Sequence, residues 1–482
     1  MASRAKPSRG RGRKPPHPPS ESSTDEDSQD SQDSQAEQAE QAEQDLQDAQ
    51  PAPIYMDANA TTLMSPATIE TMVRWCNRGN PSSEYAAAKE VQRMFAKFRA
   101  AVAEALGAPL GESPADYTVV FTSGASESNC AVLVGAARSY RALTGRTPHL
   151  VLGATEHKSA RACAERLAAD GLATVTFVPP ALEGPAYGAI EPAAVAAAIA
   201  ASRDVCLVSV MTANNETGAV TDIAGLARVC AAARVPFHSD AVQAIGKTPL
   251  PPLADLQLAA LSASAHKFHG PPGVGLLVLR NSLVQGYRLC PHICGSQNGG
   301  MRGGTENVPG IAAAFAAFRS AYAGGTPALA ARAARIALLR DALWAGLAAR
   351  LPAFHIAAAA TPAARAAQAA AAAGGPPVIF RIGAAARRTL PNTLLVAVSR
   401  PGFCNRALRA ALESRGIIVG LGSACNGGGA GDGLRALGIP DPLVPGIVRL
   451  SLDDEAQAAD VATVVAAFVA VAGGPDCLKA TK

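Results

Sequence analysis

A lysine stands among small residues in the segment Ser262–Gly270, directly after an apolar run that predicts a β-strand. At such a position the amine of Lys267 can be pressed against an aldehyde cofactor and can form a Schiff base with it. Ser264 and His266 belong to the same segment and are suited to bind the phosphate of that cofactor. The alternative is a solvated charge, which is what a lysine at a strand end usually is.

An aspartate precedes this lysine by 27 residues and ends another strand-like run, in the segment His238–Gln243. Pyridoxal phosphate (PLP) needs an anion against its pyridine nitrogen, since the protonated ring is the electron sink of its chemistry. Asp240 is suited to that role, and Gln243 can hydrogen-bond the ring's phenolic oxygen. The alternative is that Asp240 caps the N-terminus of a helix.

The segment Phe121–Asn129 predicts a strand, a turn of small residues and then the start of a helix. Backbone N–H groups and the helix dipole at such a turn suit a phosphate group. We expect the amide of Ala125 and the hydroxyl of Ser126 to be the donors. The alternative is an ordinary helix N-cap formed by Ser123 or Ser126.

Two further polar residues follow predicted strands. His157 can stack on the cofactor ring and Asn215 can donate to its phenolic oxygen, although a lone histidine is more often structural and an asparagine often marks a turn. Each of these five segments stands at or just after the C-terminal end of a predicted strand, where open parallel sheets place their ligands. The ordered set, rather than any one member, therefore predicts a PLP site.

From about Pro53 the chain alternates short apolar runs with alanine-rich helical stretches, which predicts an α/β fold with a mainly parallel sheet covered by helices. We expect a large domain at residues 53–312, whose first residues pack with a smaller α/β domain at residues 313–482. A low-complexity patch at Ala357–Gly375 is typical of a surface insertion. The predicted strands are His149–Leu152, Thr174–Val178, Val205–Met211, Val235–His238, Leu258–Ser262, Val274–Leu279, Val378–Ile382, Thr393–Val398, Ile417–Val419 and Ile447–Leu452.

The composition indicates a globular protein, with 482 residues, 49% of them hydrophobic and 17% charged. No apolar run is long enough to span a membrane and no signal peptide is evident, so we expect a soluble intracellular protein without membrane partners. The ten cysteines lack disulfide-scaffold spacing, which favours reduced thiols. The net charge of +4 does not point to nucleic-acid binding.

Residues 1–52 differ from the rest in composition. Six basic residues fall within Met1–Lys14, and eleven acidic residues lie between Glu21 and Asp48 among Ser and Gln repeats. Such a segment has too little apolar surface to offset the entropy of ordering, so we expect a disordered tail. Its basic start is either a nuclear-import signal or a solvated tail, and prolines argue against a mitochondrial transit helix. We therefore expect the cytoplasm or the nucleus.

Five further segments identify the resemblance: the chain is similar to the cysteine desulfurases, which are fold-type I PLP enzymes, from roughly Ile54 to the C-terminus. The segment around Cys425 resembles the subgroup whose nucleophilic cysteine rides a mobile loop, here near residues 420–433, with glycines on both sides to supply mobility. The segments are Tyr55–Thr62, Gly79–Ser83, Met301–Gly310, Arg388–Thr393 and Gly422–Asn426.

The resemblance implies roles for individual residues. It implies that Lys267 and His157 are catalytic and that Cys425 takes the sulfur of L-cysteine as a persulfide, leaving alanine. It also implies that Asn392 and Arg449 bind the substrate; a guanidinium fork suits the substrate's carboxylate.

Partners follow from the same resemblance. Thr305 is expected to reach the phosphate of the neighbouring subunit, which implies a homodimer. The persulfide is expected to serve a sulfur-acceptor protein, in iron–sulfur cluster assembly or in tRNA thiolation.

The chain departs from the family pattern at several positions. Glu84 and Tyr85 follow Ser83 where a histidine is usual, and the segment between Cys425 and Leu434 is shorter and richer in glycine. These departures leave the catalytic groups in place, but they alter the surface that meets an acceptor.

Three alternatives stay open. One is selenocysteine lyase or cysteine sulfinate desulfinase activity, one is a catalytically idle regulatory partner, and one is nucleic-acid binding through the basic N-terminus. Cys290 and Cys294, with one histidine between them, form an incomplete zinc ligand set, so we expect no metal. We expect the nine cysteines other than Cys425 to be small buried fillers.

Overall fold

The computed structural model describes residues 52–359, 361–383, 388–422 and 431–478, and Pro53–Lys482 form one compact unit. The tail predicted for residues 1–52 lies, except for Ala52, outside the described residues. So does Cys425.

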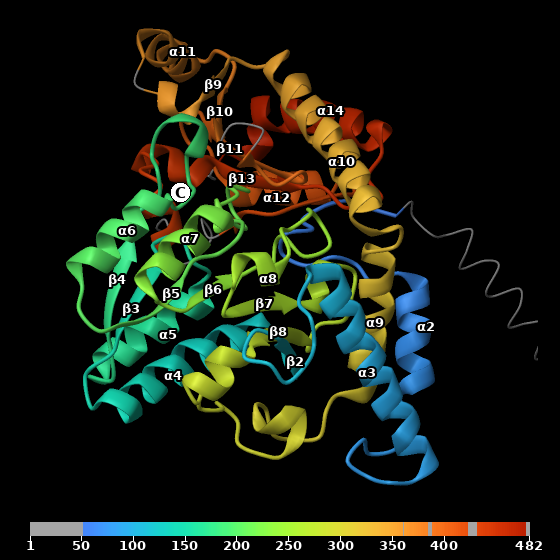
Figure 1. Cartoon of the computed structure of the whole chain (residues 1–482). Coiled ribbons are helices and arrows are strands. Elements are labelled where there is room, and N and C mark those ends of the chain that lie inside the picture. Colours follow the sequence, from blue (N-terminus) through green and yellow to red (C-terminus); the bar gives the residue numbers. More distant parts are fainter. Residues whose placement is uncertain (1–51, 360, 384–387, 423–430, 479–482) are drawn as a thin grey trace, which may run out of the picture. The chain divides into compact units, whose positions relative to one another are not determined.

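The larger of the sheets has seven strands in the order β2-β8-β7-β6-β5-β3-β4 (Figure 1). All run in one direction except β8, which is antiparallel to both of its neighbours. The fold is therefore the expected α/β class with a mainly parallel sheet. Its strands are β2 (Tyr117–Thr122), β3 (His149–Gly153), β4 (Thr174–Val178), β5 (Val205–Ser209), β6 (Phe237–Asp240), β7 (Ala260–Ser264) and β8 (Gly275–Arg280).

Helices cover both faces of this sheet because both faces are apolar. In β2, Val119 and Phe121 point into one core, while Val120 between them points into the other. The first core packs against α3, α6, α7 and α9, and the second against α4 and α5. The helices are α2 (Pro66–Trp75), α3 (Ala86–Leu106), α4 (Ala125–Thr144), α5 (Lys158–Ala169), α6 (Pro192–Ala201), α7 (Ile223–Ala233), α8 (Leu253–Leu256) and α9 (Val308–Ala321).

A second sheet has four strands in the order β13-β11-β10-β9, and only its β10–β9 pair is parallel. A hydrophobic core lies on each face of this sheet. One core packs against α10, α12 and α14, and the other packs against α11 and α13. The elements are β9 (Ala353–His355), β10 (Val378–Ile382), β11 (Thr393–Ser399), β13 (Ile447–Ser451), α10 (Gly325–Ala348), α11 (Pro362–Ala372), α12 (Asn405–Glu413), α13 (Asp432–Ala436) and α14 (Ala458–Gly473).

The start of the compact unit joins this second group of elements. Strand β1 (Ile54–Met56) pairs in parallel with β12 (Ile417–Val419), and Asp57 forms a bridge with Ser451 at the end of β13. A chain segment from the N-terminal side thereby lies beside strands that come more than 350 residues later. The domain boundary expected near residue 312 stays a prediction.

Each strand predicted from the sequence is present. Three have the predicted bounds, and the ends of the others are shifted; the three are Thr174–Val178, Val378–Ile382 and Ile417–Val419. The strand expected at Val235–His238 is Phe237–Asp240 instead, because Pro236 has no N–H to give to the ladder. The patch expected as a surface insertion at Ala357–Gly375 contains helix α11, capped by Thr361. Ala364 and Ala371 of this helix are buried in the core of the second sheet, so the segment is more than a surface insertion.

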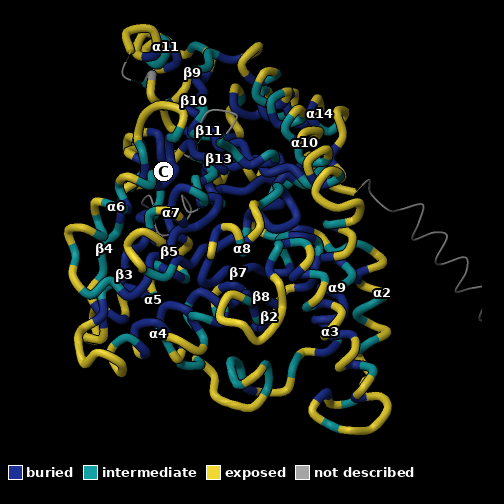
Figure 2. Tube along the Cα trace, in the orientation of Figure 1, coloured by how far each residue is buried: buried dark blue, intermediate teal, exposed yellow. Residues whose placement is uncertain are grey.

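Burial follows the layers (Figure 2): the strands are mostly buried, and the outer faces of the helices are exposed. No helix within the described residues is both long and apolar enough to cross a membrane.

An aromatic cluster anchors α3 and α9 to the large sheet. The fully buried ring of Phe98 lies with its centroid 5.4 Å from that of Phe121, 5.1 Å from that of Phe315 and 5.7 Å from that of Phe318. Aromatic pairs at such separations add to the hydrophobic stabilisation of burial.

We expect Phe98→Ala to lower the free energy of unfolding by about 3–5 kcal/mol, because it leaves a cavity among three aromatic rings. Leu338→Ala on α10 is the control, since that side chain is 72% exposed, and we expect a change within about 0.5 kcal/mol. Denaturant titration followed by circular dichroism measures both. Equal midpoints for the two variants would contradict this account of the core.

Candidate functional site

The sequence-predicted residues gather at one edge of the large sheet. Strands β2, β3, β5, β6 and β7 run in the same direction, so their carboxyl ends meet there. The residues that follow these ends carry the candidate chemistry. They are Ala125 and Ser126 after β2, His157 after β3, Asn215 after β5, Asp240 and Gln243 at and after β6, and Ser264, His266 and Lys267 at and after β7.

The carboxylate of Asp240 is buried and fixed at both oxygens. Oδ2 accepts a hydrogen bond of 2.7 Å from Nδ2 of Asn129, and Oδ1 accepts one of 3.0 Å from the backbone N–H of Val242. The bond from Val242 is a local cap, similar to the capping role that the sequence analysis named as the alternative for Asp240. This cap engages only Oδ1. Asp240 is therefore held as an oriented carboxylate by groups on both sides.

The amine of Lys267 lies against the backbone of the N-terminal segment. Nζ donates to the carbonyl oxygens of Asn59 and Ala60, each at 2.6 Å. Burial, and then the positive charge of Arg449, lower the pKa of Lys267 to about 8, against the opposing effect of Asp57 and Asp240. A neutral amine, the form that acts as a nucleophile or a base, is therefore available near neutral pH.

Asn59, to which the sequence analysis assigned no role, connects most of these groups. Its carbonyl oxygen also accepts a bond of 3.0 Å from Nε2 of Gln243. Its side-chain Oδ1 accepts bonds from Nζ of Lys247 at 3.2 Å and from Nδ2 of Asn392 at 3.1 Å. Asn59 belongs to the segment Tyr55–Thr62, which the sequence analysis singled out as a motif. The motif did not indicate which residues the Asn59 side chain contacts.

Lys247 is a second lysine of the site that the sequence analysis did not single out. Its Nζ donates to Oε1 of Gln243 at 2.7 Å. Burial and the nearby charge of Lys267 lower the pKa of Lys247 to about 7. Its position shortly after Gln243, in the turns that follow β6, is the only sequence signal that could have indicated it. Of the Gln243 amide, one N–H remains for a cofactor oxygen.

Arg449 is buried on β13 and is held on two sides. One terminal nitrogen donates to the carbonyl of Asn215 at 3.1 Å and the other to Oδ1 of Asp57 at 2.7 Å. Nε of Arg449 is buried without a partner among the described residues. The fork is therefore oriented by the protein and keeps one donor uncommitted.

The turn before α4 is built on glycines. Gly124, and neither Ser123 nor Ser126, is the N-cap residue, so the predicted alternative of a serine cap is wrong. A Cβ on Gly124 would lie 3.9 Å from Oγ of Ser264, which brings that hydroxyl to the start of the helix. A Cβ on Gly275 would lie 2.6 Å from the Gly124 backbone. Any side chain at position 275 would therefore clash with this turn, so β8 packs beside the turn only with glycine there.

The two histidines of the site differ in environment. His157 is exposed and is the N-cap of α5, where its Nδ1 accepts a bond of 3.2 Å from the N–H of Ser159. His266 lies 3.2 Å from Oγ1 of Thr61 through its Nδ1. Burial and the charges of the two lysines lower the pKa of His266 to about 4, so its ring is neutral at physiological pH.

A buried acid beside His157 was also missed. Oε1 of Glu156 accepts a bond of 2.6 Å from the N–H of Met211, while Oε2 has no partner among the described residues. Burial, and to a lesser extent the charge of Asp240, raise the pKa of Glu156 well above its usual range. Nothing in the polar sequence context of Glu156, from Thr155 to Lys158, signals this burial.

The role of one predicted residue, Thr305, is not tested by the described part of this chain. Thr305 is exposed in the segment before α9, and its role across a dimer stays a prediction. Cys425 lies outside the described residues. Asn392, by contrast, is buried and donates to Asn59 and to the carbonyl of Leu452 at 3.2 Å.

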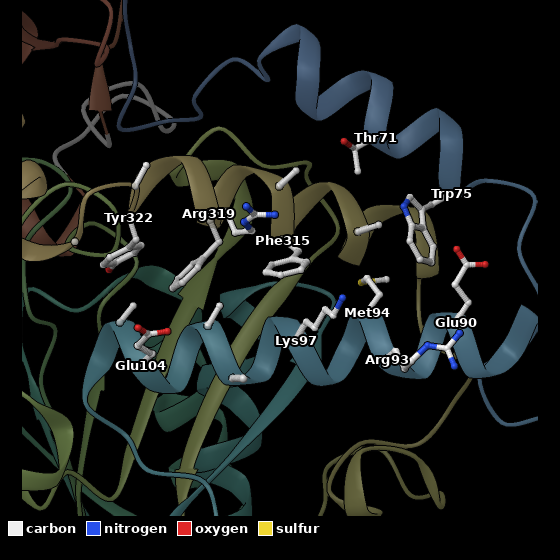
Figure 3. A pocket seen from close by; sticks show the side chains of 18 of the residues that line it. Thr71, Trp75, Glu90, Arg93, Met94, Lys97, Glu104, Phe315, Arg319 and Tyr322 are labelled. Carbon is white, nitrogen blue, oxygen red and sulfur yellow. The ribbon is translucent and has the colours of Figure 1, made fainter.

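A larger cleft lies elsewhere in the described structure. A cleft of about 1150 Å³ between α2, α3 and α9 is lined by residues such as Trp75, Met94 and Phe315, and it contains none of the predicted site residues (Figure 3). A much smaller cavity lies at Lys247 and Lys267. The candidate site is therefore identified by the reactive and binding side chains that lie close together there, and not by the volume of its cavity.

The described cysteines are all free thiols. The expectation of buried fillers is confirmed for Cys206, Cys230 and Cys477 but wrong for Cys76 and Cys294, which are exposed. Within the described parts of the chain, no group of three or more His, Cys, Asp and Glu side chains is placed to hold a metal ion.

Comparison with known proteins gives consistent results. Residues 54–368 match the family Aminotransferase class-V. A cysteine desulfurase of Cereibacter sphaeroides is 34% identical over 85% of this chain and 92% of that protein, and one of Bradyrhizobium diazoefficiens is 35% identical over 86% and 93%. A solved NifS-like protein superposes with a TM-score of 0.69 at 28% identity, over 86% of this chain and 98% of that chain.

The lowered pKa of Lys267 gives a prediction. In the protein freed of any bound aldehyde, we expect acetylation of Lys267 by trace acetic anhydride to rise with a midpoint near pH 8. In Arg449→Gln the midpoint should move to higher pH, because a nearby positive charge is lost and Asp57 loses its ion-pair partner. Peptide mass spectrometry measures the labelling.

Arg74→Gln is the matched control, since Arg74 forms an exposed ion pair with Glu70 on α2. It should leave the midpoint unchanged. An unmodified chain that titrates at Lys267 near pH 10 would contradict the electrostatic description of the site.

Proposed function

Because the chain belongs to the aminotransferase class-V family and, within it, to the cysteine desulfurases, we propose that it removes sulfur from L-cysteine with PLP as its cofactor. One observation carries the proposal: a buried amine with a lowered pKa and a doubly fixed carboxylate converge on one sheet edge, at Lys267 and Asp240. An aldehyde cofactor with a basic ring nitrogen needs both groups.

The residues present fit PLP. The start of α4 offers backbone N–H groups to a phosphate, and the hydroxyl of Ser264 lies beside it. Asp240 would face the ring nitrogen, and Asn215 and Gln243 would donate to the phenolic oxygen. When bound, PLP would supply the electron sink that weakens bonds at the substrate's α- and β-carbons.

Lys267 has two tasks in this proposal. As a neutral amine it would attach the cofactor, and after L-cysteine displaces it, it would carry protons to and from the substrate. The carbonyl oxygens of Asn59 and Ala60 hold the amine in place at other times. His157, whose Nδ1 is occupied by the N–H of Ser159, would present Nε2 toward the substrate.

Arg449 would bind the carboxylate of L-cysteine. Its bonds to Asp57 and to the carbonyl of Asn215 fix the plane of the guanidinium, and buried Nε supplies an uncommitted donor. Asn392 would stand beside the substrate. These contacts hold the substrate while its side chain reacts.

Cys425 would be the sulfur acceptor. The thiolate of Cys425 would attack the sulfur of L-cysteine while the electron pair of the breaking Cβ–S bond stays with the carbon. That carbon would take up a proton, so that alanine and a persulfide are the products. We further propose that the enzyme is a homodimer with Thr305 shared between subunits. The persulfide would then pass its sulfur to an acceptor protein, in iron–sulfur cluster assembly or in tRNA thiolation.

We expect Cys425→Ala to lower turnover of L-cysteine about a hundredfold or more while leaving the visible absorbance of bound PLP intact, because only the nucleophile is lost. Lys267→Ala should abolish both. Alanine and sulfide release measure turnover, and the mass of the tryptic peptide 416–435 reports the added sulfur.

Cys76→Ala serves as the control because Cys76 is an exposed thiol on another part of the fold. Full turnover of L-cysteine by Cys425→Ala would favour selenocysteine lyase or cysteine sulfinate desulfinase chemistry. An unmodified chain that shows no visible PLP absorbance would favour an idle regulatory partner.

The glycine turn gives a second prediction. We expect Gly275→Ala to weaken PLP binding about tenfold or more, because its Cβ displaces the Gly124 backbone at the start of α4. Gly286→Ala is the control, since a Cβ there meets nothing within 4 Å. Titration of the cofactor-free protein with PLP measures both affinities, and equal values would argue against a phosphate site at this turn.

A further inference from the structure

Two cysteines outside the catalytic machinery lie beside the candidate site. Cys130 is on the first turns of α4 and Cys163 is on α5, and both side chains are only partly buried. The two helices pack against each other and against the same face of the large sheet. None of the roles assigned above uses either thiol.

The geometry brings the two thiols together. Sγ of Cys130 lies 3.8 Å from the carbonyl oxygen of Ser159, which is one helical turn before Cys163. Residues four apart share a face of a helix, so Cys163 stands on the α5 face that meets Cys130. The interaction of the two thiols is also the largest cause of the lowered pKa of Cys130, which agrees with side chains that lie close together.

This pair is connected to the cofactor-facing groups. Asn129, the neighbour of Cys130, donates to Oδ2 of Asp240 at 2.7 Å and to Oγ of Ser159 at 3.3 Å. Oγ of Ser159 in turn lies 2.8 Å from Nδ1 of His157. A change in the spacing of α4 and α5 at these turns therefore acts on Asp240 and on His157.

We propose that Cys130 and Cys163 form a reversible disulfide when the protein meets a low-molecular-weight disulfide such as glutathione disulfide, and that this bond disturbs the adjacent cofactor site. Formation of the disulfide does not depend on the proposed function. The effect of the disulfide on the cofactor site rests on that function.

The reaction is a pair of thiol–disulfide exchanges. The thiolate of Cys130 attacks one sulfur of glutathione disulfide and releases one glutathione thiolate, which leaves a mixed disulfide. Cys163 gives up its proton, attacks Sγ of Cys130 and displaces the second glutathione thiolate. Two protein thiols are oxidised to one disulfide, one disulfide is reduced to two thiols, and the protons end on the glutathione.

The electrostatics assign Cys130 as the attacking thiol. The hydrogen bond from Cys163 outweighs burial and lowers the pKa of Cys130 to about 7, while the pKa of Cys163 is raised. A thiol with a lowered pKa beside a second, resolving thiol is the arrangement of redox-sensitive cysteines.

The test begins with the full, unmodified chain. It is reduced, freed of reductant, incubated with glutathione disulfide, treated with iodoacetamide and digested with trypsin. We expect a cross-link between the peptide of residues 100–138 and that of residues 162–166, which dithiothreitol removes. Both cysteines remaining alkylated, or Cys130 joined to a different cysteine, would overturn the proposal.

Variants sharpen this result. Cys163→Ser should leave Cys130 as a mixed disulfide with glutathione, and Cys76→Ser should keep the cross-link. At pH 7, alkylation of Cys130 should be about threefold slower in Cys163→Ala, because alanine lacks the donor that stabilises the Cys130 thiolate. An unchanged rate would show that Cys163 does not activate Cys130.

The effect on the site is measured in the Cys425→Ala chain, so that oxidation of the proposed nucleophile does not contribute. Oxidation should change the visible spectrum of bound PLP, and the additional change Cys130→Ser should prevent this. A cross-link with an unchanged spectrum would refute the effect on the site. A chain that binds no PLP but still forms the cross-link would refute only the proposed function.

Discussion

The site depends on one residue, Asn59, whose backbone carbonyl and side chain together join segments that are far apart in the chain. Its carbonyl oxygen accepts from Lys267 and Gln243 of the large sheet, and its side-chain amide joins Lys247 to Asn392 near the second sheet. A buried amide with each of its groups engaged is costly to disturb, because every lost partner leaves an unpaired polar group. The position of the reactive amine is thus set by a residue that itself performs no chemistry.

Charge at the site is arranged by burial. Lys247, Lys267 and Arg449 are all withdrawn from water, and the pKa values of both lysines fall as a result. Burial raises the pKa of the acid Glu156, which disfavours a negative charge beside these cations. A pocket with several cationic groups and one oriented carboxylate suits a ligand that carries a phosphate, a carboxylate and one basic nitrogen.

Sequence patterns predicted the strands and the residues at their carboxyl ends well, since β-branched apolar runs followed by polar residues have a clear physical meaning in a parallel sheet. They did not predict Asn59 or Lys247, because the roles of both depend on partners that only the fold brings near. Glu156 was missed for a related reason: its burial comes from the packing of β3 and β5 and not from its polar neighbours. The helix at Pro362–Ala372 escaped notice because alanine repeats carry little periodic signal.

The parallel pairing of β1 with β12 has a consequence for the order of assembly. Asp57 and Arg449, which form one ion pair, are 392 positions apart, so the pair cannot exist until synthesis has passed residue 449. The large sheet can form earlier from local strand–helix units. A complete pocket, able to take up a small molecule, is therefore a late product of chain synthesis and not an early one.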